Sequence, residues 1–111
     1  MAEIVEEIKP LPGEPVLDKQ AFSGFTNPQL HNLLGAQNIS TLVVAGLATS
    51  QCVNSTVRAA SDLGYGIIQL YDAMADYDEQ SHNAALISSV GACGANILST
   101  HELISESQAT F

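Results

Sequence analysis

The chain has 111 residues, of which 46% are hydrophobic and 14% are charged. A chain of this size can bury one core, so we expect a single folded domain over residues 1–111 rather than extended disorder. Three Lys and Arg stand against twelve Asp and Glu, and the formal net charge of −9 excludes unaided binding to nucleic acid or to an anionic membrane surface.

Neither a membrane helix nor a signal peptide is predicted. No apolar run approaches the ~20 residues of a membrane span, and the first residues are acidic where a signal peptide is basic and then apolar. We therefore expect a soluble, cytoplasmic protein in which Cys52 and Cys93, without C-x-x-C spacing, are free thiols. The histidines lack metal-ligand spacing, so no metal or other cofactor is expected, and three surface residues are predicted: His31, His82 and His101.

The first third of the chain predicts an irregular arm, a short strand and a helix. Residues 1–15 hold three of the four prolines and show no sustained periodicity, which is typical of an irregular lead-in. Residues 16–19 are predicted to form a short strand. A helix that is capped by Thr26 or Asn27 and has Pro28 in its first turn should follow. Its buried stripe is expected to contain Leu30, Leu33 and Leu34.

The middle of the chain predicts a strand followed by a helix. Residues 41–46 are a continuous apolar run of strand length, and such runs favour a strand that is covered on both faces in a parallel sheet. From residue 50 to residue 63 the apolar period becomes helical, and Gly64 supplies a stop. Arg58 and Asp62 are spaced for a surface ion pair on this helix.

The last third of the chain repeats the alternation. A strand is predicted at residues 67–71, a helix from Asp76 or Asp78 to Gly91, and a third strand at residues 95–99. The acidic segment at residues 101–106 is expected to fray. Capping or loop roles are favoured over site-facing ones for Asp72, Asp76 and Tyr77. The order of elements predicts an α/β fold with a parallel three-stranded sheet and helices on one or both faces.

Cys52 occupies the junction where parallel α/β sheets bind ligands. It follows the strand at residues 41–46 by a short turn and lies in the first turn of the next helix, whose unpaired N–H groups and dipole favour an anion. Such a position stabilises a thiolate, and the same N–H groups can bind a developing oxyanion. Position alone also allows a small buried apolar residue, the commonest role of a lone cysteine.

Motifs in three regions of the chain stand out together. The middle region reads VAGLATSQCVNSTVRAA at 44–60, continued by DLGY at 62–65; the downstream region has DAMADY at 72–77 and HNAAL at 82–86; the upstream region has GEPVLDK at 13–19 and FSGF at 22–25. Together they resemble the isochorismatase-like cysteine hydrolases, a family that includes nicotinamidases, isochorismatases, and ureidoacrylate and N-carbamoylsarcosine amidohydrolases. The middle region is similar to the nucleophile segment of that family, and the upstream region is similar to its lysine segment. The resemblance spans nearly the whole chain and implies a three-layer α/β/α, Rossmann-like fold.

The resemblance also implies a mechanism in which a Cys, a Lys and an Asp cooperate. Cys52 would be the nucleophile and Lys19 its charged partner. A non-proline cis peptide at Leu47-Ala48 would turn the amides of Ala48 and Cys52 toward the substrate oxygen. For a small-molecule amide or related C–N substrate, the thiolate would attack, an amine would leave and a thioester would be hydrolysed. Candidate oxyanion and substrate positions are Leu47, Ala48, Thr49, Phe22 and Phe25, with core packing equally open for the two aromatic residues.

The resemblance covers only the carboxy-terminal half of the family pattern. The aspartate of the family ends a strand in an amino-terminal half that has no counterpart in this sequence, and Asp18, next to Lys19 in a strand, would point to the opposite face. The strand at residues 42–45 would then have an open apolar edge, which invites pairing. We therefore expect a homo-oligomer, a complementing amino-terminal segment, or a truncated piece of a longer protein.

Two functions follow from these observations. The first is a cysteine hydrolase of small amide or related C–N substrates that uses Cys52 and Lys19. The second is a catalytically impaired, truncated relative that keeps the fold and acts as a binding or assembly module, because the aspartate is absent.

Overall fold

Three parallel strands form the sheet in the computed structural model, which describes residues 4–110. The strands are β1 (Thr41–Leu47), β2 (Gly66–Ala75) and β3 (Asn96–Leu98), in the order β1-β2-β3. β1 pairs with β2 from Thr41 opposite Gly66, and the register shifts between Val44 and Gly46. The predicted parallel α/β arrangement is confirmed.

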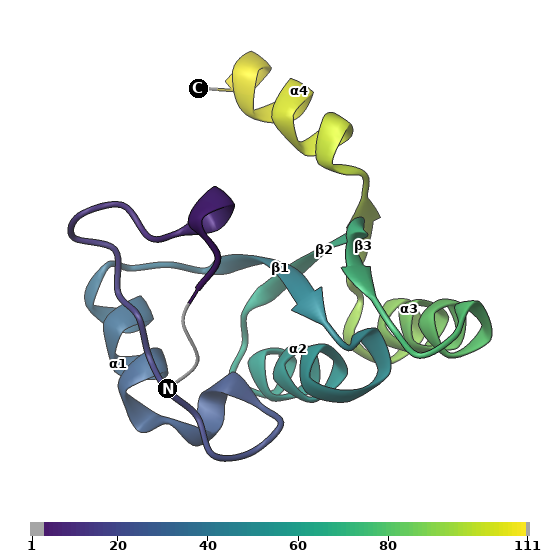
Figure 1. The fold of residues 1–111 in the computed structure, drawn as a ribbon, viewed down its shortest axis with the longest axis horizontal. Helices are drawn as coiled ribbons and strands as arrows, with labels where there is room; N and C mark the ends of the chain where they lie inside the picture. The colour runs from purple at the N-terminus through teal and green to yellow at the C-terminus, as the bar shows by residue number, and fades with distance from the viewer. Residues whose placement is uncertain (1–3, 111) are drawn as a thin grey trace.

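Helices alternate with the strands and flank the sheet (Figure 1). α2 and α3 lie side by side against the sheet, α1 lies beside the start of β1, and α4 projects from the end of β3. The four helices are α1 (Pro28–Ala36), α2 (Asn54–Asp62), α3 (Glu79–Cys93) and α4 (Thr100–Thr110). Two short 3-10 turns and one π-helical turn complete the described residues: η1 (Glu6–Ile8), η2 (Gly24–Thr26) and η3 (Thr49–Val53).

The main core lies between α2 and the sheet. The helical period predicted from residue 50 onward is confirmed, since the apolar stripe that begins in η3 and continues along α2 is buried against β2 and the start of β3. This cluster consists of Val53, Val57, Ala60, Ile67 and Ala95. A second contact joins α3 to the same face of β2, where the buried Ser89 hydroxyl donates a hydrogen bond to the side-chain oxygen of the buried Gln69.

The helix starts follow the capping residues in the sequence. Asn27 accepts a hydrogen bond from the Gln29 amide at 3.0 Å, with Pro28 as the first residue of α1. Asp78 accepts one from the Ser81 amide at 2.7 Å and caps α3. Side-chain oxygens at these positions satisfy amides that have no partner within the helix, which explains why both helices begin there.

The predicted strand at residues 16–19 is wrong. This segment pairs with no strand in the described part of the chain. The Asp18 carbonyl instead accepts a hydrogen bond from the Asn27 side chain at 2.8 Å. An extended backbone becomes a strand only when a neighbouring strand supplies its hydrogen-bond partners, and β1 pairs only with β2 here.

The expectation that the acidic end of the chain frays is also wrong, because the segment forms the helix α4. The Ser99 amide donates to the Glu102 carboxylate at 2.9 Å, and the Glu102 amide donates to the Ser99 hydroxyl at 3.0 Å. This reciprocal pair is a capping box. Asp72 at the end of β2 accepts two further hydrogen bonds, from the Thr100 amide and the Thr100 hydroxyl.

β1 has one covered face and one open face. Leu42 and Val44 pack against the core, whereas Val43 on the other face is 48% exposed. The prediction of a strand covered on both faces is therefore wrong, since the residues of this second face are exposed. The strand order also leaves β1 at an edge of the described sheet, as the resemblance implied. Leu33, expected in the buried stripe of α1, is exposed.

None of the helices among the described residues has the length and apolar character needed to cross a membrane.

Candidate active site

Cys52 lies in the turn that joins β1 to α2. The peptide bond between Leu47 and Ala48 is cis, as the resemblance implied. The Ala48 carbonyl then accepts hydrogen bonds from the amides of Gln51 at 3.0 Å and Val53 at 3.2 Å, so the chain reverses at once into η3 and α2. The prediction that Cys52 follows the strand in a first helical turn is confirmed.

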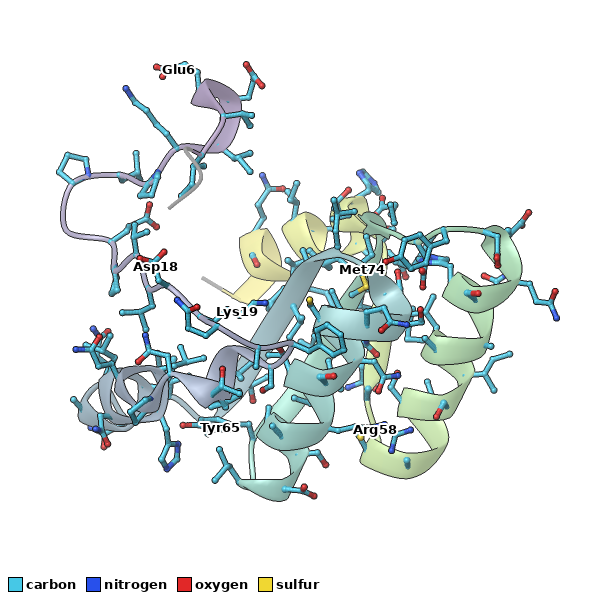
Figure 2. The ribbon with its side chains drawn as sticks, turned by 60° about the horizontal axis from the view of Figure 1, so that its bottom comes forward. Glu6, Asp18, Lys19, Arg58, Tyr65 and Met74 are labelled. Atoms are coloured by element: carbon cyan, nitrogen blue, oxygen red, sulfur yellow. The ribbon has the colours of Figure 1, made fainter. Side chains whose placement is uncertain are left out.

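Lys19 reaches Cys52 from a segment 33 residues earlier in the chain. Its Nζ atom lies 3.6 Å from Cys52 Sγ and 2.9 Å from the carbonyl oxygen of Ala21, and it donates to both. Figure 2 shows the Lys19 side chain extending from the amino-terminal segment toward the end of β1 and the start of the following helix. An ammonium group beside a thiol favours the thiolate form.

Thr56 joins the two segments that carry these side chains. Its hydroxyl donates to the Cys52 carbonyl at 2.8 Å and accepts a hydrogen bond from the Gly24 amide at 2.9 Å. From the sequence, Thr56 was only one residue of the helix predicted from residue 50 to residue 63. Its place four residues after Cys52, within the segment that resembles the nucleophile motif, was the one signal that could have pointed to a role at the site.

Thr49 and the half-buried His82 contact each other beneath the turn. Thr49 is fully buried, and its Oγ1 atom lies 2.6 Å from His82 Nδ1 and 3.3 Å from the Ala75 carbonyl oxygen. The side chain of Thr49 therefore faces the interior, which leaves its backbone as the part that can meet a substrate. The prediction of His82 as a surface residue is wrong, because this contact draws it against η3.

Asp76 caps the turn from the end of β2. Its carboxylate accepts hydrogen bonds from the Ser50 amide at 2.7 Å and from the Tyr77 amide at 2.8 Å. Hydrogen bonding by the Ser50 side chain is the largest of the effects that hold the pKa of Asp76 below 3.8. The two amides and the nearby His82 lower this pKa further, while partial desolvation opposes them. Asp76 therefore faces the turn that carries Cys52, and the predicted cap of the following helix is supplied by Asp78.

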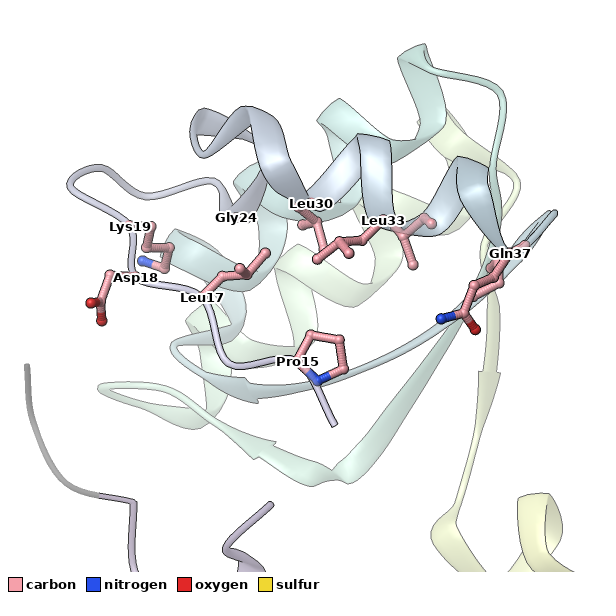
Figure 3. Close-up of a pocket in the computed structure, with 10 residues that line it drawn as sticks. Pro15, Leu17, Asp18, Lys19, Gly24, Leu30, Leu33 and Gln37 are labelled. Atoms are coloured by element: carbon pink, nitrogen blue, oxygen red, sulfur yellow. The ribbon is translucent and has the colours of Figure 1, made fainter. Parts of the chain in front are cut away.

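Among the cavities that border this region, two exceed 300 Å³. One of about 350 Å³ is lined by Leu47 and Ala48 of the cis peptide and by Ala75, Asp76 and Tyr77. The other, of about 420 Å³, lies between α1 and the segment before it, with Lys19 and Asp18 at one end (Figure 3). Its walls are mainly apolar and include Pro15, Leu17, Leu30, Leu33 and Leu34.

The remaining predicted positions divide between core and surface. Phe25 packs against the main core and stacks on Tyr65 with ring centroids 5.8 Å apart, which matches the core alternative for this residue. Phe22 is 59% exposed and Leu47 is 71% exposed, so both side chains are accessible. The predicted ion pair of Arg58 with Asp62 is wrong, since Arg58 donates instead to the side chains of Asn54 and Ser88.

The described residues supply no acidic partner for the Lys19–Cys52 pair. No carboxylate among them lies within salt-bridge distance of Lys19, and the neighbouring Asp18 is exposed. Nor do three or more His, Cys, Asp or Glu side chains gather anywhere in residues 4–108 to form a metal site. Cys52 and Cys93 are both free, half-buried thiols.

A family model described as the isochorismatase domain matches residues 1–102. The chain belongs to the isochorismatase family. The resemblance to this family in the nucleophile and lysine segments is thereby confirmed.

Individual relatives agree with this family membership. The ureidoacrylate amidohydrolase RutB of Cronobacter sakazakii is 46% identical over 71 residues, which cover 64% of this chain and 31% of that protein. A cysteine hydrolase from Pseudomonas syringae pv. phaseolicola 1448A superposes with a TM-score of 0.92 at 25% identity, over 98% of this chain and 56% of that one. N-carbamoylsarcosine amidase from Thermoplasma acidophilum gives a TM-score of 0.78 at 34% identity, over 87% of this chain and 54% of that one.

In each of these matches, this chain covers only part of the length of the relative. The aligned region spans about a third of the RutB protein and just over half of the two solved structures.

Proposed function

We propose that this chain carries the nucleophile part of a cysteine hydrolase that cleaves a small amide or related C–N bond. Cys52 is the nucleophile, and Lys19 holds its thiolate. The observation that carries the proposal is the 3.6 Å contact between Lys19 Nζ and Cys52 Sγ at the start of a helix. The names of two relatives, a ureidoacrylate amidohydrolase and an N-carbamoylsarcosine amidase, support the amide substrate class.

In the proposed reaction the Cys52 thiolate attacks the carbonyl carbon of the substrate. A C–S bond forms, and the carbonyl electron pair moves onto oxygen, where the amides of Ala48 and Cys52 stabilise the negative charge. The oxygen electrons then return, the C–N bond breaks, and the leaving nitrogen takes a proton to depart as ammonia or an amine. Water cleaves the resulting thioester, which releases the acid and restores the thiol.

Proton transfer in this scheme needs a group that the described residues do not offer to Lys19 and Cys52. We assign that role to an aspartate on another polypeptide segment, as the family resemblance implies. The same segment would cover the open edge of β1. It would come from an amino-terminal segment or from a second copy of this chain.

The test is ammonia release from ureidoacrylate and from N-carbamoylsarcosine. The chain is assayed alone and after co-expression with the part of the Cronobacter sakazakii relative that precedes its matched region. We expect turnover in the co-expressed sample that is lost in Cys52→Ala and kept in Cys93→Ala, a matched control because both thiols are free and half-buried.

Retained turnover in Cys52→Ala would overturn the proposal. Absence of turnover with both substrates in both samples would overturn it as well, in favour of the binding or assembly module.

A further inference from the structure

We propose that Thr56 is a positioning residue that sets the contact between Lys19 and Cys52. This inference rests on the proposed function, since it concerns how the thiolate of that function is held. Thr56 contacts neither a substrate nor the sulfur. It acts through its hydroxyl, which bonds the Gly24 amide on one side and the Cys52 carbonyl on the other.

The segment that carries Lys19 needs such an anchor. Residues 14–19 have no strand partner among the described residues, and Lys19 itself is exposed. Within the described part of the chain, two hydrogen bonds link residues 19–24 to the turn and helix that carry Cys52. One is the Lys19 contact to the sulfur, and the other is the Gly24 contact to Thr56.

These contacts close a ring that runs through the backbone. Lys19 Nζ donates to the Ala21 carbonyl and to Cys52 Sγ, and the chain continues to Gly24. The Gly24 amide donates to Thr56, which returns to the carbonyl of Cys52 itself. If the Gly24–Thr56 bond is lost, the Lys19 ammonium can move away from the sulfur without breaking any other hydrogen bond to that helix.

The geometry fits a threonine and a glycine at these two positions. A hydroxyl that bonds the carbonyl four residues earlier is common in helices and by itself has only a local structural role. Here that bond orients the lone pairs of the oxygen toward the Gly24 amide. A Cβ atom on Gly24 would lie 3.7 Å from the Thr56 methyl and 3.3 Å from a methyl of Leu30, so side chains of α1 and α2 already occupy the space beside Gly24.

The experiment measures iodoacetamide alkylation of Cys52 at about pH 6.5 and about pH 9, with Cys93 in the same molecule as the reference, by peptide mass spectrometry. The ratio that is compared is the Cys52 rate at about pH 6.5 divided by the Cys52 rate at about pH 9, normalised by the same quotient for Cys93. It reports how well the thiolate is stabilised, because an unperturbed thiol is mostly protonated at the lower pH and mostly ionised at the higher one. We expect Thr56→Val, which keeps the shape and loses the hydroxyl, to lower this ratio about five- to tenfold. Thr56→Ser, which keeps the hydroxyl, should restore most of the ratio.

Two further variants separate positioning from a merely structural role. Thr56→Ala removes the same hydroxyl without adding an atom beside Gly24, so this variant covers the case in which Thr56→Val fails to fold. It should lower the ratio as Thr56→Val does. In a Lys19→Met background neither change should lower the ratio further.

An unchanged ratio in folded Thr56→Val or folded Thr56→Ala would overturn the inference. The inference would also be overturned if the Thr56 substitutions lowered the alkylation ratio equally in the wild-type chain and in the Lys19→Met background. The effect would then not pass through the ammonium group. If Lys19→Met alone leaves the ratio unchanged, the proposed function loses its charged partner and the inference falls with it.

Discussion

Asp76 makes the start of the Cys52 turn dependent on pH. Its carboxylate caps the turn through the Ser50 amide, and the pKa of Asp76 in the folded chain lies below 3.8. A carboxyl whose pKa is lowered by folding stabilises the folded chain at every pH above its unfolded value, and this contribution is lost as the pH falls through the folded value. The capping contribution should therefore be complete above about pH 5 and disappear in the acid range.

We expect Asp76→Asn to lower the thermal midpoint of unfolding at about pH 7 and to have a smaller effect at about pH 3. Thermal denaturation followed by circular dichroism at both pH values measures this difference. Asp62→Asn, on α2 and away from the turn, is the matched control. The difference between its thermal midpoint and that of the wild type should not shrink from about pH 7 to about pH 3. A constant gap between wild type and Asp76→Asn at all pH values would contradict the capping role.

The individual residues of the site were predictable to different degrees. Cys52 and Lys19 stand in segments that resemble a family, so their pairing could be expected before any distance was known. Thr56 and His82 could not be given roles in the same way. Their partners Gly24 and Thr49 lie more than thirty residues away in the chain, and only the packing of α2 and α3 on the sheet brings them together.

Among the elements, α4 shows how a short capping signal can outweigh composition. The sequence STHE at residues 99–102 contains a capping box, whereas the acidic composition of this segment suggested fraying. Ser99→Ala removes the side-chain acceptor for the Glu102 amide and should cost about 1 kcal/mol of unfolding free energy. Urea denaturation measures the loss, and hydrogen exchange locates it in α4.

Ser105→Ala is the control for this prediction, because Ser105 is exposed in the interior of the same helix. Alanine is a better helix former than serine, so this change should be neutral or slightly stabilising. Equal destabilisation by the two substitutions would contradict the cap.

Elements with a long apolar period were predicted well, and elements defined by a partner were not. The helical stripe from residue 50 and the apolar run of β1 carry a local signal for the type of element, a helix and a strand respectively. Residues 16–19 have the length of a short strand, yet a strand also needs a neighbour, and no local pattern reports whether one is present.

For the entire chain, the open edge of β1 predicts self-association. We expect the average mass in sedimentation experiments to exceed 11.7 kDa and to rise with concentration, because an apolar strand with unpaired amides and carbonyls favours pairing. Val43→Lys places a charge on the open face of β1 and should shift the chain toward the monomer. Ile87→Lys is the control, since Ile87 is equally apolar and 74% exposed on α3.

A mass equal to the monomer across the concentration range would contradict self-association through this edge, as would an equal response to the two lysine substitutions. The parallel α/β fold itself was predictable from the alternation of elements. The exposure of one face of β1 was not, because a run such as TLVVAGL indicates burial without stating which segment provides it.

The most direct measurement is the rate at which iodoacetamide alkylates Cys52 and Cys93 in the same sample of the unmodified chain at about pH 6.5. Both thiols are half-buried, so exposure alone gives neither an advantage. The contact between Lys19 and Cys52 predicts that Cys52 reacts at least about ten times faster, and that Lys19→Met removes this advantage. Equal and slow labelling of the two cysteines would contradict an activated nucleophile at position 52.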